Sequence, residues 1–197
     1  MTFLQLGGHP ALDFLNTYYT PPGETVETLL DGPAFLEWLA AAGLLEAGEA
    51  ARLKRTFGRE ALDGAAAEAR AVREWARGWL PRWREAPRGD HRRVLAELNR
   101  LLGRVPIQRA IVAGESGPAI VDRAQVTEPA ALIGLVAARF AALLATEDPA
   151  LLKQCAGAGC SLWFVDRTKA HRRLYCSATA CGNRAKVSAF RARVALR

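Results

Sequence analysis

The chain has 197 residues, half of them hydrophobic, which suits one domain with a sizeable core, or one domain with a small appendage. Its net charge of +7 is unevenly placed: residues 153–197 hold ten basic residues and one acid, whereas residues 1–152 are almost neutral. A basic tail on a neutral body indicates a polyanionic partner, with nucleic acid favoured over an anionic membrane surface or an acidic protein.

Neither a signal peptide nor a membrane span is predicted. The amino-terminal residues lack the basic start and apolar run of a signal peptide. The most apolar stretch, residues 129–145, is shorter than a span requires and contains Arg139. We therefore expect a cytoplasmic protein without a membrane segment, whose reduced cysteines are metal ligands rather than disulfides.

Helical patterns dominate the first 150 residues. Residues 11–17 follow a Gly-Gly-His-Pro turn and predict a short helix or strand, which the local pattern does not decide. Pro81 is expected to kink or end the longest helix. The segments in which apolar side chains recur at helical spacing are residues 34–42, 47–57, 62–84, 90–102 and 127–145.

Two extended segments interrupt this helical pattern. Residues 105–112 and 119–124 flank a glycine-rich turn and predict a β-hairpin. A domain boundary is expected after the last predicted helix, which gives an α+β domain over residues 1–150 and a separate unit over residues 151–197. No long linker separates the two, so the second unit is expected to pack against the first.

All four cysteines lie in the second unit, as two C-x4-C pairs separated by fifteen residues. Such pairs supply two thiolates each on tight turns, which is what one tetrahedral zinc ion needs. The predicted ligands are Cys155, Cys160, Cys176 and Cys181. Because four thiolates leave no open position for water, the Zn²⁺ is expected to be structural rather than catalytic. His171 is the alternative ligand, and the four cysteines are favoured over it.

The segments around the cysteines predict a treble-clef finger. Residues 161–166 and 172–175 read as the two strands of a hairpin, and Cys181 as the start of a helix. Val187, Phe190 and Val194 share one stripe of that helix, which we expect to pack on the hairpin.

The basic residues of the finger are the candidate nucleic-acid contacts. Arg184 and Arg191 lie on one flank of the final helix, and Lys186, Arg193 and Arg197 on the other. Some of this charge could instead offset the formal −2 of a zinc tetrathiolate. The candidate residues are Arg167, Lys169, Arg172, Arg173, Asn183, Arg184, Lys186, Arg191 and Arg193.

The body offers one polar set of interest. His9, Asp13 and Asn16 could line a pocket for a small-molecule effector, although a capped turn with a buried polar network is the favoured interpretation. Three tryptophans at helical spacing, Trp75, Trp79 and Trp83, are read as core rather than as a stacking platform. No nucleotide-binding loop, nucleophile elbow or metalloprotease helix is present, so an enzyme is the least favoured class.

Two segments resemble known families. Cys181-Gly-Asn-Arg184, with Phe164-Val-Asp166 and Cys176-Ser177 before it, resembles the CGNR zinc finger over residues 153–194, with Tyr175 where that family usually has tryptophan. Residues 8–17, Gly-His-Pro-Ala-Leu-Asp-Phe-Leu-Asn-Thr, resemble the opening of the ABATE domain. The resemblance implies a bacterial, stress-linked transcription regulator whose treble-clef finger binds zinc through the four cysteines and contacts nucleic acid.

The expected function is therefore transcription regulation through DNA binding by the finger. The body would dimerise or sense an effector. RNA binding and a zinc-stapled protein-interaction module are the alternatives. Competition between DNA and RNA duplexes would separate the first two, and absence of nucleic-acid affinity at low salt would favour the third.

Overall fold

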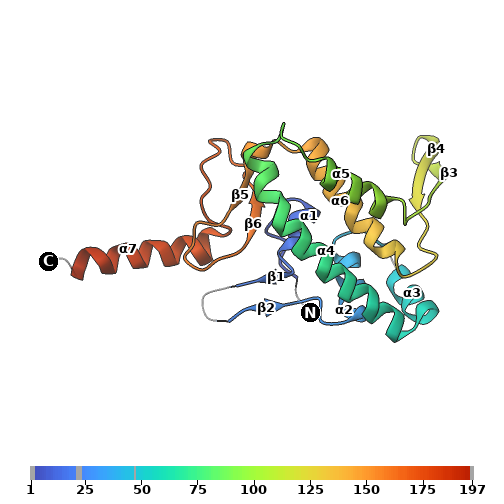
Figure 1. The fold of residues 1–197 in the computed structure, drawn as a ribbon, viewed down its shortest axis with the longest axis horizontal. Coiled ribbons are helices and arrows are strands. Elements are labelled where there is room, and N and C mark those ends of the chain that lie inside the picture. The colour runs from blue at the N-terminus through green and yellow to red at the C-terminus, as the bar shows by residue number, and fades with distance from the viewer. Residues whose placement is uncertain (1–2, 21–23, 47, 196–197) are drawn as a thin grey trace.

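A computed structural model describes residues 3–20, 24–46 and 48–195 (Figure 1). It is an α+β fold, as predicted: a mainly helical body, a β-hairpin and a carboxy-terminal cysteine-rich unit that ends in a helix. The helices are α1 (Pro10–Leu15), α2 (Gly32–Ala41), α3 (Glu49–Phe57), α4 (Arg59–Glu85), α5 (Arg92–Leu102), α6 (Ala131–Thr146) and α7 (Asn183–Ala195). The strands are β1 (Tyr18–Tyr19), β2 (Val26–Glu27), β3 (Ile107–Gly114), β4 (Gly117–Ala124), β5 (Leu152–Gln154) and β6 (Trp163–Val165).

Helix α6 lies at the centre of the body and packs on α1, α4 and α5. Its Phe140 ring lies 6.0 Å from the ring of Phe14 and 5.9 Å from that of Trp79, both edge to face. Such aromatic pairs contribute about 1 kcal/mol beyond their buried area. Trp79 and Trp83 are buried, and Trp75 is half-buried against the same cluster, so the core interpretation holds fully for two of the three tryptophans on α4.

The structure settles two local questions. Residues 10–15 form a helix, because Pro10 suits its first turn and the His9 side chain accepts the Ala11 N–H at its amino end. Pro81 does not end α4, which runs on to Glu85. Leu80 and Trp83, on either side of Pro81, are both buried, and their packing holds the helix together across the missing hydrogen bond.

A short antiparallel pair, β1 with β2, was not predicted. It brings Glu27 to the guanidinium of Arg73 on α4, with two hydrogen bonds of 2.8 and 2.5 Å. Burial alone would raise the pKa of Glu27, but the hydrogen bonds from Arg73 hold it below its usual value. Arg73 is only 2% exposed, so this ion pair belongs to the body's interior.

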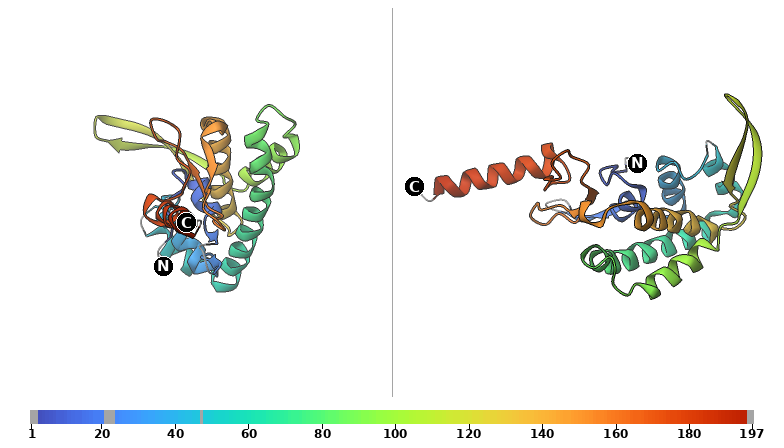
Figure 2. Two further views of the ribbon diagram at one scale, coloured as in Figure 1. Left: turned by 90° about the vertical axis from the view of Figure 1, so that its left-hand side faces the viewer. Right: turned by 90° about the horizontal axis from the view of Figure 1, so that it is seen from above.

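The predicted hairpin is present as β3 and β4, paired antiparallel from Ile107↔Ala124 to Gly114↔Gly117. It projects from one end of the body, whereas α7 projects from the other, as the views of Figure 1 and Figure 2 show.

The expected strand pairing in the cysteine-rich unit was wrong. Strand β6 forms as predicted, but it pairs with β5, in the register Leu152↔Val165 and Gln154↔Trp163. Residues 172–175 are not a strand, although the Leu174 carbonyl accepts the Ala156 N–H at 2.8 Å. Both faces of β6 are buried, because Trp163 and Val165 pack in the body's hydrophobic cluster and Phe164 packs in the cluster around the cysteines; this explains why all three residues are apolar.

Candidate metal centre and nucleic-acid interface

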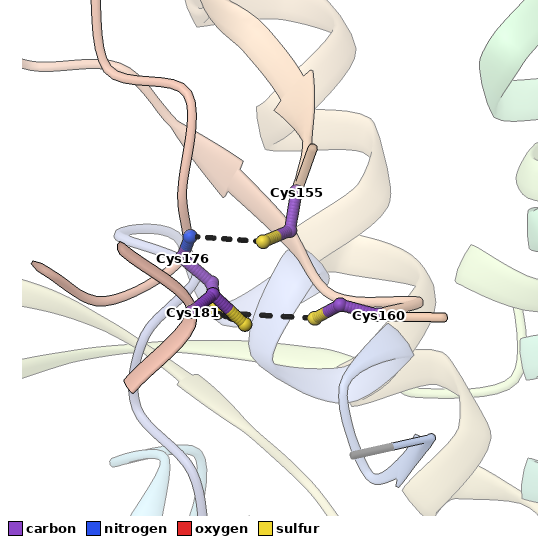
Figure 3. Close-up of side chains that lie close together, drawn as sticks. All are labelled: Cys155, Cys160, Cys176 and Cys181. Atoms are coloured by element: carbon purple, nitrogen blue, oxygen red, sulfur yellow. Dashed lines mark hydrogen bonds between the residues drawn. The ribbon is translucent and has the colours of Figure 1, made fainter. Parts of the chain in front are cut away.

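Four sulfur atoms converge where the two cysteine turns meet (Figure 3). Cys155 directly follows β5, and Cys160 closes the first turn. Cys176 follows the loop after β6, and Cys181 lies in the single turn Ala178–Gly182 that leads into α7. All four side chains are buried free thiols, and their Sγ atoms lie within 4.8 Å of one another.

The donor set fits one zinc ion. Tetrahedral sulfur ligands at about 2.3 Å from zinc lie about 3.8 Å from each other. The Sγ atoms of Cys176 and Cys181 are 3.6 Å apart, and those of Cys160 and Cys176 are 3.9 Å apart. Four thiolates complete the coordination that zinc prefers in structural sites, so the ion would cross-link the turns without an open position for catalysis.

Hydrogen bonds to sulfur support the same assignment. The backbone N–H groups of Cys176 and Gly157 donate to Cys155 Sγ at 3.2 and 3.4 Å. The Arg184 guanidinium donates to Cys181 Sγ at 2.8 Å. Donors aimed at sulfur stabilise thiolate over thiol, and such outer contacts orient metal ligands.

The turn between Cys155 and Cys160 needs glycine at two positions. A Cβ atom on Gly157 would lie 3.1 Å from Cys181 Sγ and 3.4 Å from Cys155 Sγ, so a side chain there would crowd the sulfurs. Gly159 has φ +73°, in the left-handed region that glycine adopts at little cost. Together they let Cys155 and Cys160 face the same point.

At Cys160, burial favours the neutral thiol where no cation is bound. It raises the pKa of Cys160 to about 11, because the thiolate loses its hydration. A divalent cation reverses that preference, since zinc binds the deprotonated sulfur and releases the proton. Four neighbouring thiolates would repel one another, and a bound divalent cation would offset that repulsion.

The finger is joined to the body through the polar set of α1. The Asn16 amide donates to the Trp163 carbonyl and its oxygen accepts the Trp163 N–H, both at 2.9 Å. Asp13 accepts the Gly7 N–H at 2.8 Å, and the Gly7 carbonyl in turn accepts the Val165 N–H at 2.8 Å. Asn16 thus pairs with β6 as a neighbouring strand would.

These contacts agree with the capped-turn interpretation of His9, Asp13 and Asn16. Of the three, Asp13 lines a cavity of about 190 Å³ beside Trp38. Burial raises the pKa of Asp13 and lowers the pKa of His9. A ligand-binding role for the set stays a prediction, with most of its polar atoms already bonded within the protein.

Asp166 joins three segments of the finger. Its carboxylate accepts hydrogen bonds from Lys153 Nζ at 2.5 Å, from Thr168 Oγ1 at 2.6 Å and from the Arg173 N–H at 2.8 Å. Burial alone would raise the pKa of Asp166, but these donors hold it well below its usual range. His171 Nδ1 lies 3.1 Å from the Asp166 carbonyl oxygen, so this histidine belongs to the loop rather than to the sulfur cluster.

Three of the predicted nucleic-acid contacts are bonded to residues of the body or the cysteine turns. Arg167 pairs with Glu147 at 2.5 Å. Arg173 donates to the carbonyls of Tyr175 and Cys176, and its guanidinium lies over the Phe164 ring, 4.1 Å from the centroid. The Arg184 guanidinium donates a hydrogen bond to Cys181 Sγ.

The remaining candidates are exposed to solvent. Arg193 makes one long contact, 3.3 Å, with the Ala189 carbonyl. Within residues 3–20, 24–46 and 48–195, the structure shows no side-chain hydrogen bond or ion pair for the others. Those others are Lys169, Arg172, Asn183, Lys186 and Arg191. Arg197 lies outside the described residues.

Helix α7 does not pack as predicted. Val187, Phe190 and Val194 are 49%, 61% and 56% exposed, so their stripe does not lie on the finger. The helix extends away from the body (Figure 1, Figure 2), and the turn Ala178–Gly182 is its main contact within the described chain. Residues 172–175 do not form a strand, so the hairpin on which α7 was expected to pack is absent from the described chain.

Comparison with known families agrees with both halves of the chain. Residues 8–147 match the ABATE family model, described as "Putative stress-induced transcription regulator", and residues 152–194 match the CGNR zinc finger. The chain belongs to the ABATE family. Its four clustered cysteines are those of the CGNR finger, and the site takes one structural zinc. No curated protein matches this ABATE chain.

The described part of the ABATE chain holds no helix that is both long and apolar enough to cross a membrane. Its longest helix, α4, is amphipathic and packs on α2 and α6.

Proposed function

We propose that this ABATE protein is a cytoplasmic, non-enzymatic transcription regulator whose zinc finger binds duplex DNA. One observation carries the proposal: zinc ties down the turns of the finger, while cations on its surface remain exposed. These cations are Lys169, Arg172, Lys186 and Arg191. Because phosphate contacts supply most of non-specific DNA affinity, such a surface suits a polyanion.

Helix α7 is the proposed contact element. A groove of about 450 Å³ runs along its first half, lined by Asn183, Val187 and Arg191 among others. Lys186 and Arg191 are exposed on this helix, which projects from the molecule (Figure 2). Asn183 and Arg191 are side chains that can also read base edges. Val187, Phe190 and Val194, exposed on the same helix, suit apolar contact with thymine methyl groups.

Removing two exposed cations tests this assignment without disturbing the metal. In the variant Lys186→Gln/Arg191→Gln, we expect affinity for duplex DNA to fall on the order of tenfold per lost contact at about 0.1 M salt. Arg184 is left intact because it bonds a ligand sulfur. The matched control Arg55→Gln/Arg93→Gln removes two exposed arginines from the body and should change affinity by no more than about twofold.

Competition identifies the nucleic acid. A labelled DNA duplex bound to the zinc-loaded protein is challenged with unlabelled duplex DNA, duplex RNA and single strands. Preference for RNA would replace DNA as the ligand. Equal losses in both double variants would mean that α7 is not the contact element, and absence of binding at low salt would indicate a protein partner for the finger.

The proposal assigns dimerisation or effector sensing to the helical body. In α1, Asn16 is bonded to the finger and His9 caps its own helix, which disfavours them as effector ligands. Dimerisation is therefore the better-supported role. Sedimentation of the zinc-loaded protein measures it, and a monomer throughout would leave effector sensing as the body's role.

A further inference from the structure

The β3–β4 hairpin exposes both its apolar side chains and its edges. Its two strands pair along their whole length, and their extensive contacts are with each other. Ile107, Ile111 and Ile120 are 60%, 73% and 72% exposed, and Ile111 lies directly opposite Ile120. A lone two-stranded ribbon is marginally stable in water, so an eight-residue ribbon with isoleucines in solvent indicates a missing partner.

The register shows which backbone groups face outward. Gly114 and Gly117 flank the two-residue turn as a hydrogen-bonded pair, and at the other end the Gln125 N–H donates to the Pro106 carbonyl at 2.8 Å. Hydrogen-bonded and non-bonded pairs alternate in an antiparallel ladder. The even-numbered residues of β3 therefore bond to β4, and the odd-numbered residues point their N–H and C=O groups away from it.

The two edges of the hairpin differ. On β4 the outward series contains Pro118, which has no N–H and so interrupts pairing. On β3 the outward series has no proline or lysine. It consists of Ile107, Arg109, Ile111 and Ala113. Natural sheets protect long edges with such residues unless the edge is used. We propose that β3 pairs antiparallel with β3 of a second copy of this chain, which joins two hairpins into one four-stranded sheet.

Charge is compatible with this pairing in a register that keeps the two Arg109 side chains apart. With the two-fold axis at Ile111, the two Ile111 side chains meet, and Arg109 lies opposite Ala113 of the second copy. Arg109 already pairs with Asp122 of its own hairpin, at 2.8 and 3.0 Å, so it brings no uncompensated charge to the shared edge. An axis at Arg109 would instead set two arginines against each other.

A second copy suits this edge for a further reason. The hairpin and α7 lie at opposite ends of the molecule (Figure 1, Figure 2). Residues 1–152 are almost neutral, whereas the tail is strongly basic. Pairing through β3 therefore joins two weakly charged ends, keeps the basic fingers apart and leaves both free.

Sedimentation velocity of the zinc-loaded full chain, over a range of concentrations, tests the proposal. The wild-type chain should form a dimer. Ile111→Lys places two cations at the axis, and Ile111→Pro removes an outward N–H together with the isoleucine side chain; each should weaken dimerisation at least about tenfold. Circular dichroism checks that each variant keeps the fold.

Ile120→Lys is the matched control. Ile120 is as exposed as Ile111 and lies on the same face, but in the outer strand of the four-stranded sheet. Its substitution should change the dimer dissociation constant by less than about threefold. A wild-type monomer at every concentration would overturn the proposal, as would equal losses in Ile111→Lys and Ile120→Lys. Neither result would bear on DNA binding by the finger.

Discussion

At the scale of single residues, the finger divides its arginines between structure and recognition. Arg173 and Arg184 both looked like phosphate contacts from their charge. In the structure Arg173 bonds two carbonyl oxygens, and Arg184 bonds the sulfur of Cys181. A site with formal charge −2 gains from a cation that donates directly to a thiolate.

The main effect of replacing Arg184 should therefore be a lower affinity for zinc. We expect Arg184→Gln to lower zinc affinity about 10–100-fold, as loss of an outer-shell hydrogen bond does elsewhere. Competition against a chromophoric chelator measures this. Arg191→Gln, on the same helix and without a bond to sulfur, is the control. Equal zinc affinity in the two variants would contradict the role of Arg184.

The Asn16 side chain forms two hydrogen bonds that link the body to the finger. Asn16→Ala would leave the buried N–H and C=O of Trp163 without partners, and we expect a loss of about 2–4 kcal/mol in unfolding free energy. Urea denaturation of the zinc-loaded protein gives the value. Asn99→Ala, at an exposed position on α5, should stay within about 0.5 kcal/mol. A loss for Asn16→Ala as small as that would show that the pairing is dispensable.

At the scale of elements, α7 and β6 show what residue patterns can and cannot predict. The pattern located α7 and its stripe, but not the surface opposite that stripe. The same is true of β6, whose apolar run was recognised while its partner was not. Hydrophobic spacing identifies a face, and chain topology decides what covers it.

Substitutions on the α7 stripe should cost little stability. Phe190→Ser should change the unfolding free energy by less than about 0.5 kcal/mol, because the ring is already in solvent. Phe164→Ala, in the fully buried core of the finger, should cost about 3–5 kcal/mol. Denaturant titration compares the two. A large loss for Phe190→Ser would mean that α7 packs on the protein in solution.

The loop around Asp166 should make the finger acid-sensitive. The folded pKa of Asp166 lies below the unfolded value of about 3.9, so its contribution is present above that pH and is lost as pH falls through the folded pKa. Asp166→Asn should remove this contribution and flatten the acid side of the stability curve. Thermal unfolding followed against pH measures it. An unchanged curve would contradict the role of the carboxylate.

At the scale of the whole molecule, one face of the finger packs into the hydrophobic core of the body. Leu152, Trp163 and Val165 of β5 and β6 pack in the same cluster as α1 and α6. Removal of zinc with a chelator should therefore lower the thermal midpoint of the body as well as unfold the finger, which calorimetry would record. A body transition unaffected by the chelator would show that the two units are independent.

Much of this arrangement could be predicted from the sequence. Cysteine spacing identified the metal site, because two close pairs of thiols on glycine-containing turns have few other uses. Helical periodicity located the body's helices. The sequence could not show that Asn16 would meet Trp163, or that Glu27 would meet Arg73, because these pairs are 147 and 46 residues apart. Nor could charge alone separate Arg184 from Arg191.

The most direct test of the central claim is the salt dependence of duplex-DNA binding by the zinc-loaded full chain. The account holds that zinc fixes a finger whose exposed cations meet phosphates. With Lys169, Arg172, Lys186 and Arg191 in contact, the logarithm of the binding constant should fall against the logarithm of salt concentration with a slope of about −4. Absence of binding at low salt, or a slope near zero, would contradict it.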